Sequence, residues 1–97
     1  MTTTHIPVMQ VAFELVEQAE AAGIPIGGID TYGDADYMTV RMQPATGDDA
    51  PRLAALFGLT IRTAHVYKEQ GIESFDGRVG TAAVHTQRTI PAEDVTR

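Results

Sequence analysis

The stretch VMQVAFELVEQAEAAGIPIGGIDTYGDADYMTVRM, residues 8–42, decides the fold, because it reads as a helix followed by a β-hairpin. Apolar residues recur through its first half at the spacing of one helix face. These residues are Val8, Val11, Ala12, Leu15, Val16, Ala19 and Ala22. Gly23 is expected to end the helix, since glycine adopts the left-handed conformation without penalty, and Pro25 prevents continuation.

The second half of this stretch predicts two strands, 24–31 and 38–42, joined by a turn. The return strand alternates with a period of two, so Met38, Val40 and Met42 share one face. A helix and two strands therefore form the first unit, with one apolar helix stripe and one apolar strand face.

A similar pattern follows. Asp49 is expected to cap a short helix that Gly58 ends, and strands are expected over 59–69 and 79–88. Asp76-Gly77 is the strongest hairpin signal in the chain, because both residues tolerate positive φ in a tight turn.

Gln70-Gly71 interrupts the third expected strand about halfway along its course to the Asp76-Gly77 turn, and we predict a β-bulge or bend at Gly71. With one extra residue at this position, Ala64 and Val66 share the helix-facing side with Ala82 and Val84. Without it, the small residues of the two strands would fall on opposite faces.

The predicted fold class is α+β: a two-layer sandwich in the order α-β-β-α-β-β, with a four-stranded, mainly antiparallel sheet and two helices on one face. Residues 1–97 form a single domain. Residues 1–5 are expected to be a flexible N-terminal tail and residues 89–97 a polar C-terminal tail. An αββ pseudo-repeat relates 8–42 to 49–88.

Composition excludes several classes of protein. The chain has no Cys, which removes disulfides, thiolate nucleophiles and Cys-based zinc sites. Thirteen acidic and seven basic residues give a net charge of −6, which argues against direct nucleic-acid binding and charge-driven membrane binding. The N-terminus lacks the pattern of a secretory signal, so a cytoplasmic location is expected.

Side chains able to bind a ligand lie on the outer side of the last expected hairpin. With the bulge, His65, Tyr67 and His85 point away from the helices. They are candidate ligand-binding residues for a shallow polar site; the alternative is that they are exposed strand residues without a function. Two imidazoles without a third ligand are weak evidence for zinc. No catalytic residue, metal or other cofactor is expected.

Acidic residues gather in the first unit. Those proposed to contact a partner are Glu14, Glu17, Glu20, Asp34 and Asp36. One interpretation is a face that binds a basic partner; the other is an ordinary solubilising surface.

The sequence favours a small acidic, non-enzymatic protein-interaction module. Two helices cover only one face of such a sheet, so its open face or an edge strand is expected to bind a protein, and the first candidate is a second copy that makes a homodimer. One alternative is an acidic inhibitor or regulator that occupies a basic nucleic-acid-binding site on a partner protein. The second alternative is a small enzyme or ligand binder that uses His65, Tyr67 and His85.

Overall fold

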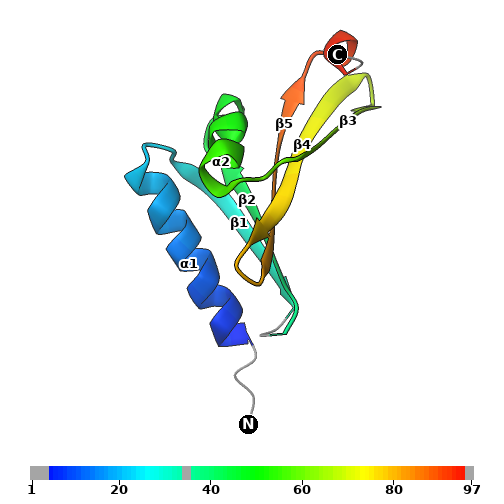
Figure 1. Cartoon of the computed structure of the whole chain (residues 1–97). Helices are drawn as coiled ribbons and strands as arrows, with labels where there is room; N and C mark the ends of the chain where they lie inside the picture. Colours follow the sequence, from blue (N-terminus) through cyan, green and yellow to red (C-terminus); the bar gives the residue numbers. More distant parts are fainter. Residues whose placement is uncertain (1–4, 34–35, 96–97) are drawn as a thin grey trace.

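The computed structural model describes residues 5–33 and 36–95. Two helices, five strands and two short 3-10 turns follow one another along this part of the chain (Figure 1). In chain order they are α1 (His5–Ala21), β1 (Ile26–Gly33), β2 (Met38–Pro44), η1 (Gly47–Asp49), α2 (Ala50–Phe57), β3 (Ile61–Tyr67), β4 (Gln70–Val79), β5 (Ala82–Ile90) and η2 (Ala92–Asp94).

The strands form one mixed sheet in the order β1-β2-β5-β4-β3, with both helices on one face (Figure 1). Three neighbouring pairs are antiparallel, and only β2 with β5 is parallel. The α+β class is therefore confirmed, but the sheet has five strands where the sequence predicted four. The second unit is α2-β3-β4-β5 rather than a repeat of α1-β1-β2, so the halves differ in strand number.

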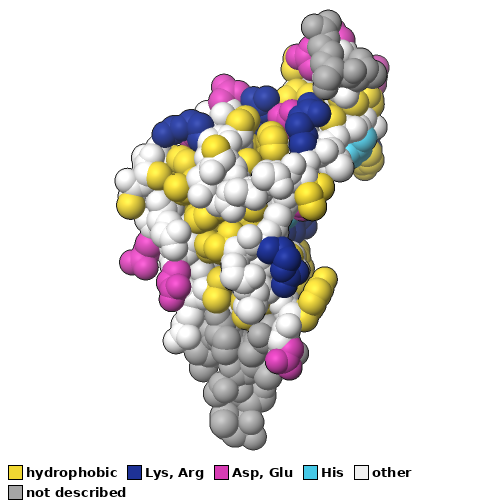
Figure 2. Space-filling model, in the orientation of Figure 1, with side chains coloured by type: hydrophobic (Ala, Val, Ile, Leu, Met, Phe, Trp, Pro, Cys, Tyr) yellow, Lys and Arg dark blue, Asp and Glu magenta, His cyan; other side chains and the backbone are white. Residues whose placement is uncertain are grey.

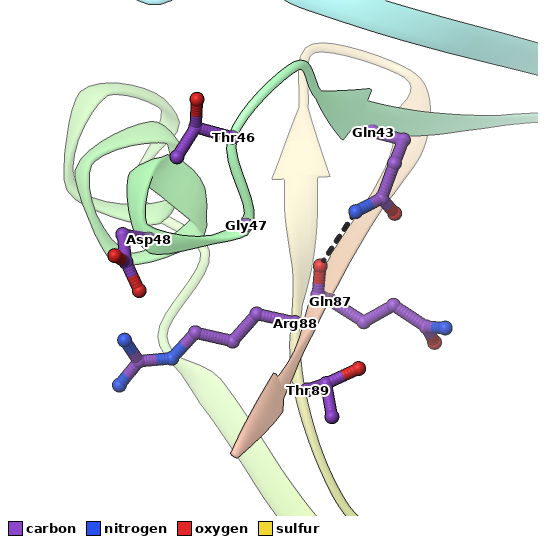
Figure 3. A pocket seen from close by; sticks show the side chains of 7 residues that line it. All are labelled: Gln43, Thr46, Gly47, Asp48, Gln87, Arg88 and Thr89. Carbon is purple, nitrogen blue, oxygen red and sulfur yellow. Dashed lines mark hydrogen bonds between the residues drawn. The ribbon is translucent and has the colours of Figure 1, made fainter.

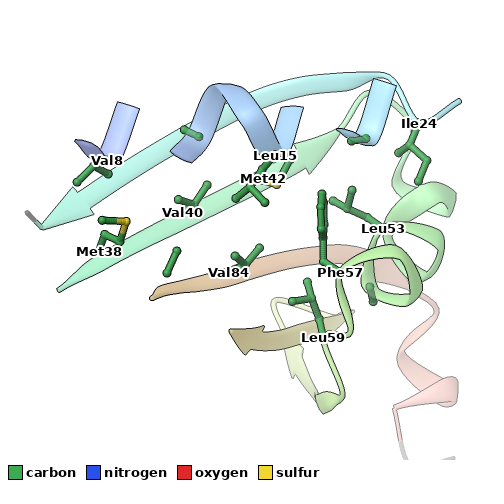
Figure 4. Packing of buried hydrophobic residues seen from close by; sticks show 14 residues of the cluster. Val8, Leu15, Ile24, Met38, Val40, Met42, Leu53, Phe57, Leu59 and Val84 are labelled. Atoms are coloured by element: carbon green, nitrogen blue, oxygen red, sulfur yellow. The ribbon is translucent and has the colours of Figure 1, made fainter. Parts of the chain in front are cut away.

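The core lies between the helices and the sheet (Figure 4). It is built from the predicted helix stripe and the predicted β2 face, joined by α2 and β5. Its largest apolar members are Val8, Leu15, Ile24, Met38, Val40, Met42, Leu53, Phe57, Leu59 and Val84. Burying each Leu, Val or Met side chain contributes about 1.5–3 kcal/mol, so this cluster supplies most of the force that holds the layers together.

Both helices end at the glycines predicted from the sequence. Gly23 and Gly58 have φ of 81° and 67°, which a side-chain-bearing residue adopts only with strain. The residue after each glycine donates its N–H back to the last helical turn, 2.9 Å from Ala19 O and 2.9 Å from Ala54 O. Asp49 does occupy the N-cap position of α2, but its carboxylate accepts a hydrogen bond from Arg52 Nη1 at 3.0 Å instead of capping a backbone N–H.

The prediction of a turn at Asp76-Gly77 is wrong. The first hairpin of the second unit turns at Lys68-Glu69, where φ is 49° and 68°. Asp76 and Gly77 lie within β4, opposite His85 and Val84 of β5. The second unit thus has three strands where two were predicted, and β4 separates β3 from β5.

The bulge predicted at Gly71 is also absent from the described strands, since Gly71 pairs in continuous register with Val66 and with Ile90. The irregularity in the sheet lies in β1 instead, between Ile26 and Gly28. The prediction that Ala64 and Val66 share a face with Ala82 and Val84 is nevertheless confirmed. The register of β3 with β4, and of β4 with β5, places all four residues on the same side of the sheet.

The two glycines within β4 do not form turns; they let other segments of the chain pack closely against the strand. A Cβ on Gly77 would lie 2.9 Å from Leu59 Cα, where the chain crosses the sheet after α2. A Cβ on Gly71 would lie 2.7 Å from Val95 Cγ2, because the segment after β5 folds back over it. The expected polar tail is therefore ordered in part: β5 continues to Ile90, and η2 packs against β4.

The molecule is elongated, measuring 50 × 25 × 20 Å. Residues 63–74 and 87–90, the distal parts of β3, β4 and β5, extend beyond α1 and α2 and are named here the arm (Figure 1). In the space-filling view, Lys and Arg side chains gather where the arm leaves the two-layer body (Figure 2).

Replacing Lys68-Glu69 by Asn-Gly is expected to stabilise the protein by roughly 1 kcal/mol, because Asn and Gly adopt positive φ with less strain. Urea unfolding followed by circular dichroism measures the change. The matched substitution Gly77→Ala is expected to destabilise by about 1–3 kcal/mol, since the new methyl group meets Leu59. A loss of stability from Asn-Gly at 68–69 would contradict the observed turn.

Candidate functional site

The open face of the sheet carries an Asp–His pair that joins β4 to β5. His85 Nδ1 lies 2.7 Å from Asp76 Oδ1, directly across the strands. The His85 side chain is 22% exposed and that of Asp76 is 42% exposed, so the pair is accessible to solvent. The carboxylate fixes the orientation of the imidazole ring by accepting its Nδ1–H.

The other nitrogen of the same ring faces Gln87. His85 Nε2 and Gln87 Oε1 are 3.2 Å apart. A neutral imidazole that donates from Nδ1 accepts at Nε2, and the amide group of Gln87 can present either its donor or its acceptor there. The result is a chain of three polar side chains, Asp76, His85 and Gln87, along the open face.

His65 and Tyr67 lie on the same face but at a distance from His85. His65 pairs with Ile72, which pairs with Thr89 of β5, four residues beyond His85. Four strand residues span about 13 Å. The Tyr67 ring instead has Lys68 Nζ 5.4 Å from its centroid. The structure therefore places His65 and Tyr67 on the arm and His85 beside β2.

A hollow opens next to His85 because β2 and β5 separate. Their parallel pairing ends at Arg41 and His85, although both strands continue. The resulting hollow on the open face has a volume of ≈ 250 Å³. It is lined by Gly28, Ile29, Asp30, Arg41, Met42, Gln43, His85 and Gln87.

A second hollow of ≈ 440 Å³ lies at the same separation, towards η1 (Figure 3). Gln43 Nε2 donates to the backbone carbonyl of Gln87 at 3.1 Å, which bridges the two strands beyond their last ladder pair. Arg88 runs past Gly47, with its guanidinium end on the side of Asp48 (Figure 3). Amide, guanidinium and carboxylate groups thus line both hollows, and the imidazole of His85 lines the first, so either hollow can bind a small polar molecule.

An ion cluster around one buried carboxylate supports this region from the helix side. Glu73 is only 5% exposed. Its Oε1 accepts from Arg88 Nε at 2.6 Å and its Oε2 accepts from Arg62 Nε. Burial alone would raise the pKa of Glu73, but the hydrogen bonds from Arg88 and Arg62 outweigh it and hold the pKa below its ordinary value.

The acidic residues of the first unit do not form one patch in the described part of the chain. Glu14, Glu17 and Glu20 are exposed along α1. Asp36 is exposed beside the tip of the β1–β2 hairpin, at the opposite end of α1 from Glu20 (Figure 1). Asp34 lies outside the described residues. The role of this acidic surface in binding a basic partner stays a prediction.

Two negative findings apply to residues 5–33 and 36–95. No three of their His, Asp and Glu side chains are grouped so that they could hold a metal ion. Neither helix in that part of the chain has the length and apolarity needed to cross a membrane.

Comparison with known proteins gives no relative: no protein-family model, no curated protein and no solved structure matches this chain.

Sequence reasoning missed the Asp76–His85 pair and the Arg62–Glu73–Arg88 cluster. Both depend on β4, which the sequence did not predict as a strand. The one available signal was the three-residue spacing of Glu73 and Asp76. If residues 70–79 form a strand, side chains alternate along it, so these two carboxylates lie on opposite faces.

Glu73→Gln is expected to lower stability at neutral pH by about 1–3 kcal/mol, because two partly buried charge-assisted hydrogen bonds to a buried carboxylate are weakened. The folded-state pKa lies below the unfolded one, so the contribution of ionised Glu73 is complete above about pH 4.5 and is lost as the pH falls through the folded-state value. Urea unfolding at neutral pH and at about pH 3 should show the gap between variant and wild type narrowing in acid.

The exposed Glu93 provides the control. Glu93→Gln should change stability little at either pH. A Glu73→Gln effect that is the same at both pH values would show that the carboxylate charge does not stabilise the cluster.

Proposed function

We propose that this chain is a small non-enzymatic protein-interaction module whose binding element is the arm, with β3 as its edge. One observation carries the proposal: β3 is the last strand of the sheet, and six of its seven residues are exposed. A strand with unpaired backbone groups along one side is a ready template for another strand.

β3 lacks the features that usually protect an edge strand. Its seven residues, IRTAHVY, include no proline, and their pairing with β4 runs without a bulge. Arg62 is its one residue with a permanent charge, and that charge is matched by Glu73 within the chain. Edges that must remain unpaired are commonly interrupted by Lys, Pro or a bulge.

Apolar side chains are also exposed on this strand. Ile61, Val66 and Tyr67 are 61%, 54% and 59% exposed. They lie beyond the main core, whose buried apolar members come from α1, α2, β2, β5 and the residues just after each helix. Exposed apolar groups beside an open backbone edge suit association with another polypeptide rather than with a small ligand.

Val66→Lys is expected to weaken association at least roughly tenfold, because a lysine ammonium at an apolar edge must be desolvated before another strand can approach. The purified chain is measured by sedimentation velocity, and the tagged chain is recovered from its host to detect a bound partner. The control Phe13→Lys replaces a side chain that is 63% exposed on α1, away from the arm.

The two variants separate the arm from general surface stickiness. Loss of the bound species in Val66→Lys alone supports the proposal. If both variants retain the same partner, or if the wild-type chain binds neither itself nor another protein, the proposal is wrong.

A further inference from the structure

We propose that the partner is a second copy of this chain, which adds its own β3 antiparallel to β3 across a two-fold axis at Ala64. The inference rests on the proposed function of the arm and names the occupant and register of its edge. Each five-stranded sheet then becomes half of one continuous ten-stranded sheet.

The turn after β3 sets which backbone groups point outward. Lys68-Glu69 is a two-residue turn, so Tyr67 and Gln70 form the closing hydrogen-bonded pair of the hairpin. Hydrogen-bonded and non-hydrogen-bonded pairs alternate along an antiparallel ladder. The N–H and C=O groups of Arg62, Ala64 and Val66 therefore point away from β4, towards the open edge.

Only one register uses all three outward residues. With the axis at Ala64, Arg62 of each copy lies opposite Val66 of the other, and Ala64 lies opposite Ala64. An axis at Thr63 or at His65 pairs only two of the three within the strand bounds. The axis at Ala64 thus gives the longest ladder, and its smallest side chain lies where the two copies meet.

The same register matches the side chains. Ile61 lies opposite Tyr67 of the second copy, and both are about three-fifths exposed in the single chain, at 61% and 59%. Thr63 lies opposite His65. Aromatic–aliphatic cross-strand pairs stabilise antiparallel strands, and no like charges face each other directly.

Charge placement agrees with a symmetric contact at β3. The acidic stripe of Glu14, Glu17 and Glu20 lies on α1, which packs on β1 and β2 at the far edge of the sheet from β3. The net charge of −6 on each copy repels the other at long range, so added salt should favour the dimer. A basic partner held by the acidic surface would show the opposite salt dependence.

This arrangement also accounts for the length of the arm. Antiparallel pairing about Ala64 places the Lys68-Glu69 turn of one copy beside residues 59–60 of the other. The arm of each copy thus extends along the body of its partner. A two-fold axis perpendicular to the sheet leaves the helices of both copies on one side and joins their open faces on the other.

Because the natural chain has no cysteine, single substitutions can report the register. Ala64→Cys is expected to form a disulfide-linked dimer under mild oxidation, since facing residues of a hydrogen-bonded pair have Cα atoms about 5.5 Å apart. Thr63→Cys and His65→Cys are the matched controls. Each would place its two sulfurs too far apart in this register, and each would cross-link efficiently only if the axis lay at its own position.

Ala64→Pro tests the same contact without oxidation. It removes an outward N–H but no bond to β4, so the fold should persist by circular dichroism while the dimer dissociation constant rises at least roughly tenfold. Sedimentation velocity measures this against the wild-type dimer, expected at twice the chain mass of 10.4 kDa. His65→Pro, which removes a bond within the chain, should instead reduce stability.

The outcomes separate three claims: the register, the second copy as partner, and the binding role of the arm. Selective cross-linking of Ala64→Cys together with dissociation of Ala64→Pro supports the proposed dimer. Preferred cross-linking of Thr63→Cys or His65→Cys overturns the register. A monomeric wild type with no cross-linked Ala64→Cys overturns the second copy as partner, while the proposed function survives only if Val66→Lys still loses a different bound protein.

Discussion

The structure depends on one long-range strand pairing, the parallel contact of β2 with β5. β1 with β2, and β3 with β4 and β5, are joined by local turns, but residues 38–41 meet residues 82–85 across nearly half the chain. This contact brings Met38 and Val40 beside Ala82 and Val84 on one face. Both helices pack over that face, so the two halves share one core only because β2 and β5 pair.

The same pairing positions the polar hollows and leaves β3 exposed. Where it ends, at Arg41 and His85, the strands separate and Gln43 bridges the gap to the Gln87 carbonyl. On the other side of β5, β4 separates β3 from the helices' main packing surface. Because the core is concentrated on β2 and β5, the two polar hollows lie where these strands separate. The β3 edge, on the far side of β4, is left uncovered.

Much of the fold can be predicted from local sequence, and the predictions that were wrong have a common cause: they depend on contacts between segments distant in the chain. The 3.6-residue stripe of α1, the glycines after both helices and the alternation in β2 are local properties, and the structure confirms them. Lys68 and Glu69 have no local preference for positive φ; the pairing of β3 with β4 imposes it. Gly77 resembles a turn residue but is required by the approach of Leu59, which no local pattern reveals. The outward direction of His65 and His85 was predicted correctly but from a bulge that the described strands lack, because β4 gives the same alignment of faces. The Asp76–His85 pair could not be predicted without the strand register.

Side-chain nuclear Overhauser effects between Val40 and Val84 test the central claim most directly, because these residues face each other only if β2 and β5 pair in parallel. We predict strong methyl–methyl effects between them, with the amide protons of the β2–β5 junction among the slowest to exchange. Effects that place Val84 beside β1 or β3, or the lack of any between Val40 and Val84, would contradict the strand order and the uncovered edge derived from it.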